Sequence, residues 1–290
     1  MFHGAIVATV TPFRNGKVDA AGLRRLVEFQ IRNGTDGIVP CGTTGESATL
    51  AYEEHERVID LVVEAADGRV PVIAGTGSNN TKEAIVLTRY ARKAGADAAL
   101  VITPYYNKPT QKGLVAHFTA VAEAADIPII LYNVPGRTGV NMAAETVARL
   151  TEVKNIVGVK EASGNLAQIC DILQMTPKTF CVLSGDDGLY FPMLALGAKG
   201  VISVVSNVAP KEMADLYDAF ALGELALARD IHFRLWPLMQ ALFIETNPIP
   251  AKTALAMMGK IREEFRLPLC PMSDGNRKAL AKVLSGLKIL

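Results

Sequence analysis

Short apolar runs alternate along this chain with longer stretches in which apolar residues recur every three or four positions. The apolar runs cover residues 5–10, 37–39, 70–74, 98–102, 128–132, 156–160, 180–184 and 200–204. The longer stretches that follow them cover residues 20–33, 53–66, 81–94, 113–125, 143–150, 166–174, 189–196 and 210–222. The runs predict buried β-strands and the longer stretches predict amphipathic helices. A strand followed by a helix is therefore expected eight times.

Eight successive strand-helix units favour an α/β fold closed into a (β/α)8 TIM barrel. Several runs are nearly continuous in Val, Ile, Leu and Ala, which is typical of parallel strands covered on both faces. An open doubly wound sheet is the alternative. However, no Gly-x-Gly-x-x-Gly opens the first helix, so a dinucleotide-binding fold has little support.

Residues 224–290 follow the last strand-helix unit and are more than a barrel needs to close. They contain helical patterns at 224–244, 251–258 and 273–284, joined by links that contain proline. We therefore expect a catalytic barrel over residues 1–223 and a C-terminal helical appendix over residues 224–290. The pattern leaves open whether these helices cover the barrel or serve assembly.

Composition narrows the range of partners. The chain has 30 Lys and Arg against 29 Asp and Glu, with no dense basic cluster, so neither nucleic acid nor an anionic membrane is an expected partner. The N-terminus lacks a basic segment followed by a long apolar one, and no stretch approaches the roughly 18 apolar residues of a membrane span. We expect a cytoplasmic protein. The Cys and His residues are not spaced as metal ligands, so no metal is expected.

The position most indicative of chemistry is Lys160, which ends the apolar run at residues 156–160. An unpaired charge in a buried strand is costly, and desolvation favours the neutral amine. A neutral amine attacks a ketone to form an imine, so Lys160 is the predicted nucleophile. A salt bridge with Glu161 is the alternative. Strand alternation places Gly158 on the same face as Lys160, where its missing side chain would leave space for a substrate.

Hydroxyl groups follow the second predicted strand, at Thr43 and Thr44, and are bracketed by Gly42 and Gly45. Such a loop presents hydroxyls and backbone N–H groups, and we expect it to hold a carboxylate. The alternative is a helix cap in which Glu46 takes part.

Tyrosines and an arginine lie where the fourth and fifth predicted strands end. Tyr106 and Tyr132 could relay protons, or could fill the rim of the barrel with their hydroxyls in solvent. Arg137 has the fork geometry to bind a carboxylate, although a surface ion pair is the alternative. Asp186 and Asp187 follow the seventh strand and make a phosphate site there less favourable. A non-phosphorylated keto acid fits these strand ends better.

Three separated motifs together resemble the dihydrodipicolinate synthase family, within the superfamily of pyruvate-dependent class I aldolases. They are residues 42–46 (Gly-Thr-Thr-Gly-Glu), 132–138 (Tyr-Asn-Val-Pro-Gly-Arg-Thr) and 158–161 (Gly-Val-Lys-Glu). The paired threonines and Arg137 favour this family over N-acetylneuraminate lyases, which typically carry Ser-Thr. The resemblance implies condensation of pyruvate with L-aspartate 4-semialdehyde to 4-hydroxy-tetrahydrodipicolinate, in the diaminopimelate route to lysine.

The resemblance also implies roles for individual residues. Lys160 would form the Schiff base, with no cofactor. Tyr132 would shuttle protons and be linked through Thr44 to Tyr106, which reaches across a tight dimer interface into the site of the partner chain. The remaining roles implied by the family are Thr43 for the pyruvate carboxylate, Arg137 for the dicarboxylic intermediate, and Gly185 and Ile202 lining the pocket, with Thr44 also among the substrate-binding positions. The usual assembly is a homotetramer built as a dimer of dimers.

Regulated members of the family bind L-lysine at the tight dimer interface. The matching positions are Ser47, Ala48, His55, Asn79, Glu83 and Tyr105. Tyr52 stands where some regulated members have histidine, which bears on the strength of inhibition.

Other functions remain open on the sequence alone. Another pyruvate-dependent lyase, such as N-acetylneuraminate lyase or a sugar-acid aldolase, could use Lys160 and Tyr132 equally well. A non-catalytic barrel that senses a small acid is a second alternative. A metal-dependent aldolase is a third, made unfavourable by the missing ligand cluster.

Overall fold

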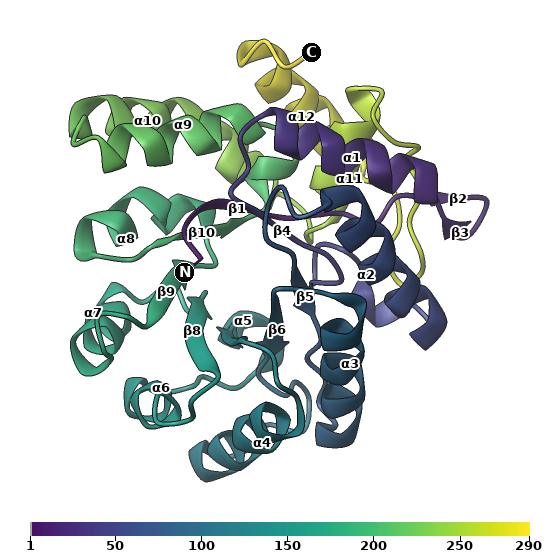
Figure 1. The fold of residues 1–290 in the computed structure, drawn as a ribbon. Coiled ribbons are helices and arrows are strands. Elements are labelled where there is room, and N and C mark those ends of the chain that lie inside the picture. The colour runs from purple at the N-terminus through teal and green to yellow at the C-terminus, as the bar shows by residue number, and fades with distance from the viewer. Residues whose placement is uncertain (1) are drawn as a thin grey trace.

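A ring of parallel strands forms the centre of the molecule in the computed structural model, which describes residues 2–290 (Figure 1). The strands of the ring are β1 (Gly4–Ala8), β4 (Gly37–Val39), β5 (Ile73–Gly75), β6 (Ala98–Ile102), β7 (Ile129–Asn133), β8 (Ile156–Glu161), β9 (Cys181–Ser184) and β10 (Gly200–Ser203). They pair in the order β4-β1-β10-β9-β8-β7-β6-β5. A parallel bridge between Ile38 and Val72 joins the two ends, so the predicted TIM barrel is confirmed.

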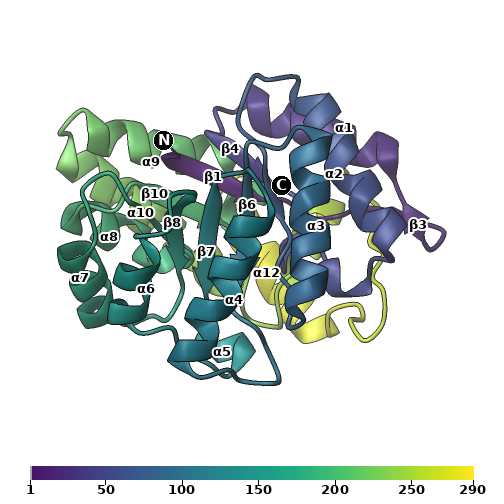
Figure 2. The same cartoon turned by 60° about the horizontal axis from the view of Figure 1, so that its bottom comes forward.

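Helices surround the ring where the apolar periodicity predicted them. They are α1 (Ala20–Arg32), α2 (Tyr52–Ala66), α3 (Thr81–Ala94), α4 (Gln111–Ala124), α6 (Ala144–Leu150), α7 (Leu166–Met175), α8 (Tyr190–Leu196) and α9 (Pro210–Ala221). The inner faces of the helices from α1 to α8, which lie around the barrel (Figure 1 and Figure 2), share one apolar core with the outer faces of the strands, because side chains of a strand point alternately into the barrel and toward the helices. Buried residues of α9 belong to a second apolar cluster.

The sequence pattern missed several short elements. They are the hairpin of β2 (Phe13–Arg14) and β3 (Lys17–Val18), the helix α5 (Pro135–Thr138), and the 3₁₀ turns η1 (Ser47–Thr49), η2 (Asp187–Leu189) and η3 (Val205–Asn207). Each is too short to show a periodicity of apolar residues. The turn η1 is the next element after β4, α5 follows β7, η2 follows β9 and η3 follows β10. These missed elements therefore lie at the carboxyl ends of the strands, where barrel enzymes build their sites.

The C-terminal helices pack on the barrel. They are α10 (Leu225–Ala241), α11 (Ile249–Met257) and α12 (Asp274–Gly286). Helix α10 lies beside α9, and α12 packs against both α10 and α11 (Figure 1). One apolar cluster contains Ala5 and Val201 of the barrel together with Leu238 and Leu280 of these helices. Covering of the barrel, one of the two roles left open, is therefore confirmed; the predicted division after residue 223 falls in the turn between α9 and α10.

A buried ion pair fastens the loop after β4 to helix α11. The side chains of Glu46 and Lys252 are both fully buried, and Oε1 of Glu46 lies 2.5 Å from Nζ of Lys252. The ammonium also stands 4.2 Å from the ring centroid of Phe13. Glu46 makes no side-chain cap to the turn that follows it, so the capping alternative was wrong. Its carboxylate instead holds the C-terminal helices against the barrel.

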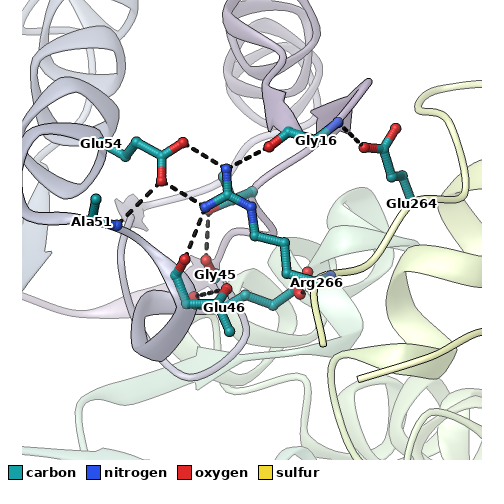
Figure 3. A network of polar contacts seen from close by, with 9 residues as sticks. Gly16, Gly45, Glu46, Ala51, Glu54, Glu264 and Arg266 are labelled. Atoms are coloured by element: carbon teal, nitrogen blue, oxygen red, sulfur yellow. Dashed lines mark hydrogen bonds and ion pairs between the residues drawn. The ribbon is translucent and has the colours of Figure 1, made fainter. Parts of the chain in front are cut away.

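Arg266 continues this connection toward the surface (Figure 3). Its backbone N–H donates to Oε2 of Glu46 at 3.3 Å, and its guanidinium donates to both carboxylate oxygens of Glu54 at 2.6 Å. The same guanidinium donates to the carbonyl of Gly16 at 2.7 Å, beside the carboxylate of Glu264, which accepts from the Gly16 N–H. Three distant parts of the chain, the first hairpin, the start of α2 and the segment before α12, thus meet around the motif at residues 42–46.

We predict that Lys252→Met lowers the free energy of unfolding by about 3–5 kcal/mol, because it leaves the Glu46 carboxylate buried without a partner. Equilibrium unfolding in urea measures this change. Lys211→Met is the matched control: Lys211 pairs with Asp215 on an exposed surface, and its loss is expected to cost under about 1 kcal/mol. A double variant, Glu46→Gln with Lys252→Met, should recover part of the loss. Equal stability of Lys252→Met and the unchanged protein would contradict the prediction.

Candidate active site

Lys160 lies on β8 beside Tyr132 of β7, the two residues being partners in the parallel ladder. Only 6% of Lys160 is exposed, and its Nζ stands 4.2 Å from the centroid of the Tyr132 ring. No ion pair of the described chain involves Lys160. The buried amine at the end of a barrel strand therefore has the environment expected of a nucleophile.

Glu161, the alternative partner of Lys160, faces the other side of the strand. Its carboxylate accepts from Nδ2 of Asn133 at 2.9 Å and from the backbone N–H of Ser163 at 2.7 Å. Successive residues of a strand point to opposite faces, so Glu161 cannot approach the amine of its neighbour. The salt-bridge alternative was wrong.

A cavity of about 330 Å³ opens in front of Lys160. Six of the predicted catalytic and substrate-binding residues line it: Lys160, Tyr132, Thr43, Thr44, Arg137 and Gly185. An amine, a phenol, hydroxyl groups and a guanidinium thus meet around a space that fits a small molecule. Cationic and hydroxyl groups together favour a ligand that carries carboxylates.

Two of the predicted residues are not part of this cavity. Tyr106 is 89% exposed and does not line the cavity. Ile202 is 1% exposed on β10 and packs in the apolar interior of the barrel. Within residues 2–290, the cavity therefore contains neither of them.

The two glycines near Lys160 play different parts. A Cβ on Gly185 would lie 3.1 Å from Cε of Lys160 and 2.7 Å from Cβ of Ala162, so glycine there leaves room for the lysine side chain. A Cβ on Gly158 would lie 2.5 Å from the carbonyl oxygen of Cys181 on β9. The expectation that Gly158 leaves space for substrate was wrong, because the close approach of the neighbouring strand uses that space.

The sequence did not point to the cavity residues supplied by the C-terminal helices. Met239, Gln240, Phe243 and Asn247 all line the cavity. Asn247 donates from Nδ2 to Oγ1 of Thr44 at 3.0 Å and accepts at its backbone carbonyl from Nη2 of Arg137 at 3.2 Å. Asn247 precedes a Pro-Ile-Pro link, but no pattern of residues revealed that this link folds back over the barrel mouth.

Asp187 is a buried acid in the wall of the cavity. Its Oδ2 accepts from the backbone N–H groups of Val204 and Val205, at 2.9 and 3.1 Å. Burial raises its pKa to about 6, and these hydrogen bonds oppose the rise. The carboxyl group therefore fixes the loop after β10 against the loop after β9.

A second cavity, of about 510 Å³, adjoins the first. Five of the six positions matched to the lysine site line it: Ser47, Ala48, His55, Glu83 and Tyr105. Asn79 does not line it, although its carbonyl accepts from the side chain of Asn107. Burial lowers the pKa of His55 to about 4, so the ring is neutral at neutral pH. The two cavities share Thr43, Tyr132, Arg137 and Asn247 among their walls.

Among residues 2–290, no three His, Cys, Asp or Glu side chains lie together as metal ligands would. None of the described helices has both the length and the apolar character needed to cross a membrane.

Comparison with known proteins places this architecture in one family. The sequence matches the Dihydrodipicolinate synthetase family over residues 1–287. Two relatives, from Geobacter sulfurreducens and Syntrophus aciditrophicus, are 61% and 59% identical over the whole of both chains, and each is called 4-hydroxy-tetrahydrodipicolinate synthase.

Solved structures agree over the whole length of the chain. The dihydrodipicolinate synthase of Aquifex aeolicus is 53% identical, with a TM-score of 0.98 and 99% of each chain covered. The enzyme of Cyanidioschyzon merolae, solved with lysine bound, is 44% identical, with a TM-score of 0.97 over 100% of this chain and 99% of that one. The fold, the motifs and these matches agree, and the chain belongs to the dihydrodipicolinate synthetase family.

Proposed function

We propose that this chain condenses pyruvate with L-aspartate 4-semialdehyde to 4-hydroxy-tetrahydrodipicolinate, through an imine on Lys160, in the diaminopimelate route to lysine. The single observation that carries the mechanism is the buried, unpaired amine of Lys160 in a cavity lined by hydroxyl groups and a guanidinium. The relatives named as 4-hydroxy-tetrahydrodipicolinate synthases, about 60% identical over the whole chain, support the overall reaction.

The chemistry begins with the neutral amine of Lys160, which attacks the ketone carbon of pyruvate. A carbinolamine forms and loses water to give the imine. The imine draws electrons from the adjacent methyl group, which loses a proton to give an enamine. The enamine carbon then attacks the aldehyde carbon of the second substrate, whose oxygen takes up a proton, and the imine on Lys160 is restored. The amino group of the second substrate then attacks the imine carbon, which closes the six-membered ring and releases the amine of Lys160. Since the imine itself accepts the electrons, the reaction needs no cofactor.

Tyr132 is the proposed proton shuttle. Its ring lies against the amine of Lys160, and the residue is 7% exposed at the wall shared by both cavities. The phenol oxygen there can accept the proton released when the enamine forms while its own O–H proton passes to the relay that includes Thr43, and transfer in the opposite direction delivers a proton to the aldehyde oxygen. Its burial excludes bulk water from the imine.

The two threonines fit different tasks. Thr43 lines both cavities, so its hydroxyl can connect Tyr132 with the side on which Tyr105 and Tyr106 lie. Thr44 lines only the cavity of Lys160, and its hydroxyl oxygen accepts a hydrogen bond from the side-chain amide of Asn247. We therefore propose Thr43 for the proton relay and Thr44 for the pyruvate carboxylate. From the sequence, Thr44 was expected in the proton relay and Thr43 at the pyruvate carboxylate, so the proposal exchanges the two roles.

Arg137 is the proposed ligand of the second carboxylate. It lies on α5 at the cavity mouth, and its guanidinium is fixed on one side by the Asn247 carbonyl. The remaining N–H groups can form a fork to a carboxylate, which suits aspartate semialdehyde. N-acetylneuraminate carries a single carboxylate, and the relatives at about 60% identity favour the synthase over such a lyase.

We predict that borohydride reduction in the presence of pyruvate adds one reduced pyruvyl group to Lys160. Reduction turns the imine into a stable secondary amine, which intact mass and peptide mapping detect. Lys160→Ala should give no adduct and lose at least about 10³-fold in turnover, because the covalent route is removed. Lys211→Met removes an exposed lysine, keeps Lys160 and serves as the lysine control. Folded protein with no adduct at saturating pyruvate would instead favour the sensor alternative.

We further propose that the active unit is a dimer within a homotetramer, a dimer of dimers, in which Tyr106 of one chain enters the site of its partner. The 89% exposure of this tyrosine, next to Tyr105 at the edge of the second cavity, supports a place in an interface. Sedimentation should give four times the mass of one chain. Tyr106→Phe should lower turnover without changing that mass. A fully active monomer would refute this proposal.

L-lysine is the proposed effector of the second cavity. Glu83 offers a carboxylate there for an ammonium group and accepts from Ser78 at 2.7 Å. Millimolar L-lysine should lower the initial rate, and L-norleucine, which lacks the terminal ammonium, should not. Glu83→Gln keeps the shape and loses the charge, so it should weaken inhibition about tenfold or more. An initial rate unchanged by L-lysine would remove the proposal.

A further inference from the structure

Asn247 connects the C-terminal helices to the cavity of Lys160. It stands between α10 and α11, is 5% exposed, and lines both cavities. Its Nδ2 donates to Oγ1 of Thr44 at 3.0 Å. Its Oδ1 is buried without a hydrogen-bond partner in the described chain, so the amide is oriented by the bond to Thr44 rather than by bonds on both sides.

The direction of this hydrogen bond determines where the Thr44 hydroxyl can donate. A threonine hydroxyl has a single hydrogen and two lone pairs. Because Oγ1 accepts the N–H of Asn247, the hydroxyl keeps its own hydrogen for another acceptor. Thr44 lines only the cavity that holds Lys160, so an acceptor bound there is within its reach. A chain of donors that ends on an anion is polarised along its length, which strengthens each bond.

We propose that Asn247 is a positioning residue: it orients the Thr44 hydroxyl toward the keto-acid carboxylate, so that the C-terminal helical part completes the active site. This inference rests on the proposed function, in which pyruvate occupies the cavity of Lys160. It assigns the link between α10 and α11 a part in binding substrate, beyond covering the barrel.

Both ends of the Asn247–Thr44 bond are held rigidly. Glu46 lies two residues after Thr44, Lys252 lies five residues after Asn247, and the two form the fully buried ion pair. The carbonyl of Asn247 accepts from Arg137, and Thr44 is itself 3% exposed. A bond between two fixed segments restricts the rotation of the Thr44 side chain, which lowers the entropy lost when the carboxylate binds.

The test compares Asn247→Ala and Asn247→Asp in the otherwise unchanged chain and in a Thr44→Val background. Asn247→Ala should raise the KM for pyruvate about five- to tenfold and change kcat less. Asn247→Asp should raise it further, because the carboxylate accepts the Thr44 hydrogen and repels the substrate carboxylate. In the Thr44→Val background, Asn247→Ala should add less than about twofold, since the residue through which it acts is gone.

Asn33→Ala is the matched control. Its amide also donates one hydrogen bond, to the carbonyl of Phe29 at the C-terminal end of α1, and Asn33 lines neither cavity. It should leave the KM for pyruvate unchanged. Thermal unfolding of each variant shows whether a change in KM accompanies a loss of stability.

The outcomes separate this inference from the proposed function. If the unchanged chain forms no reducible adduct with pyruvate, the proposed function fails first. If the adduct forms and Asn247→Ala raises the KM equally with and without Thr44, Asn247 does not act through Thr44 and the inference is overturned. An unchanged KM in Asn247→Ala would overturn it as well.

Discussion

The buried pair of Glu46 and Lys252 is the interaction on which the arrangement of the site depends. Two full charges removed from water are tolerated only when each satisfies the other, so the loop after β4 and helix α11 must meet with a definite geometry. Burial lowers the pKa of Lys252, and the neighbouring Glu46 carboxylate opposes that change. The pair holds Thr44 and Asn247 at hydrogen-bonding distance, and through them it joins the barrel mouth to the C-terminal helices.

Two lysines of this chain are buried and have opposite surroundings. Lys252 is fully enclosed, with a carboxylate at 2.5 Å and aromatic rings around its ammonium. Lys160 lies against one aromatic ring and faces a cavity, and no carboxylate pairs with it in the described chain. The ammonium of Lys252, paired with Glu46, holds helix α11 against the loop after β4. An amine without a carboxylate partner that faces a cavity is placed to attack the carbonyl of a bound molecule, so the same residue type has a structural role in one place and the proposed chemical role in the other.

The site gathers groups from separate strand ends and from the chain that follows the barrel. Parallel strands of a barrel all end at the same face, so Lys160 of β8 and Tyr132 of β7 lie side by side as ladder partners. Loops add the hydroxyls after β4, the guanidinium on α5 and the buried carboxyl of Asp187. The C-terminal part of the chain adds Met239 of α10, and Phe243 and Asn247 of the link after it, to the cavity walls. Between these polar groups, the apolar side chains of Ala8, Val39 and Leu100 line the cavity.

The strands and the surrounding helices could be predicted from the amino-acid sequence, and so could the place of Lys160 at the end of a buried strand. An apolar run that ends in Lys160 indicates a functional residue, because a buried charge is costly unless it has a partner or a function. The motifs at residues 42–46 and 132–138 likewise identified Thr43, Thr44, Tyr132 and Arg137. Tertiary structure alone decided what those residues touch. Glu161 faces away from Lys160, the space beside Gly158 belongs to Cys181, and Asn247 reaches Thr44 from 203 positions along the chain. Such contacts depend on how the elements pack against one another. The local periodicity of apolar residues predicts each helix or strand and its buried face, but not which distant segments will meet.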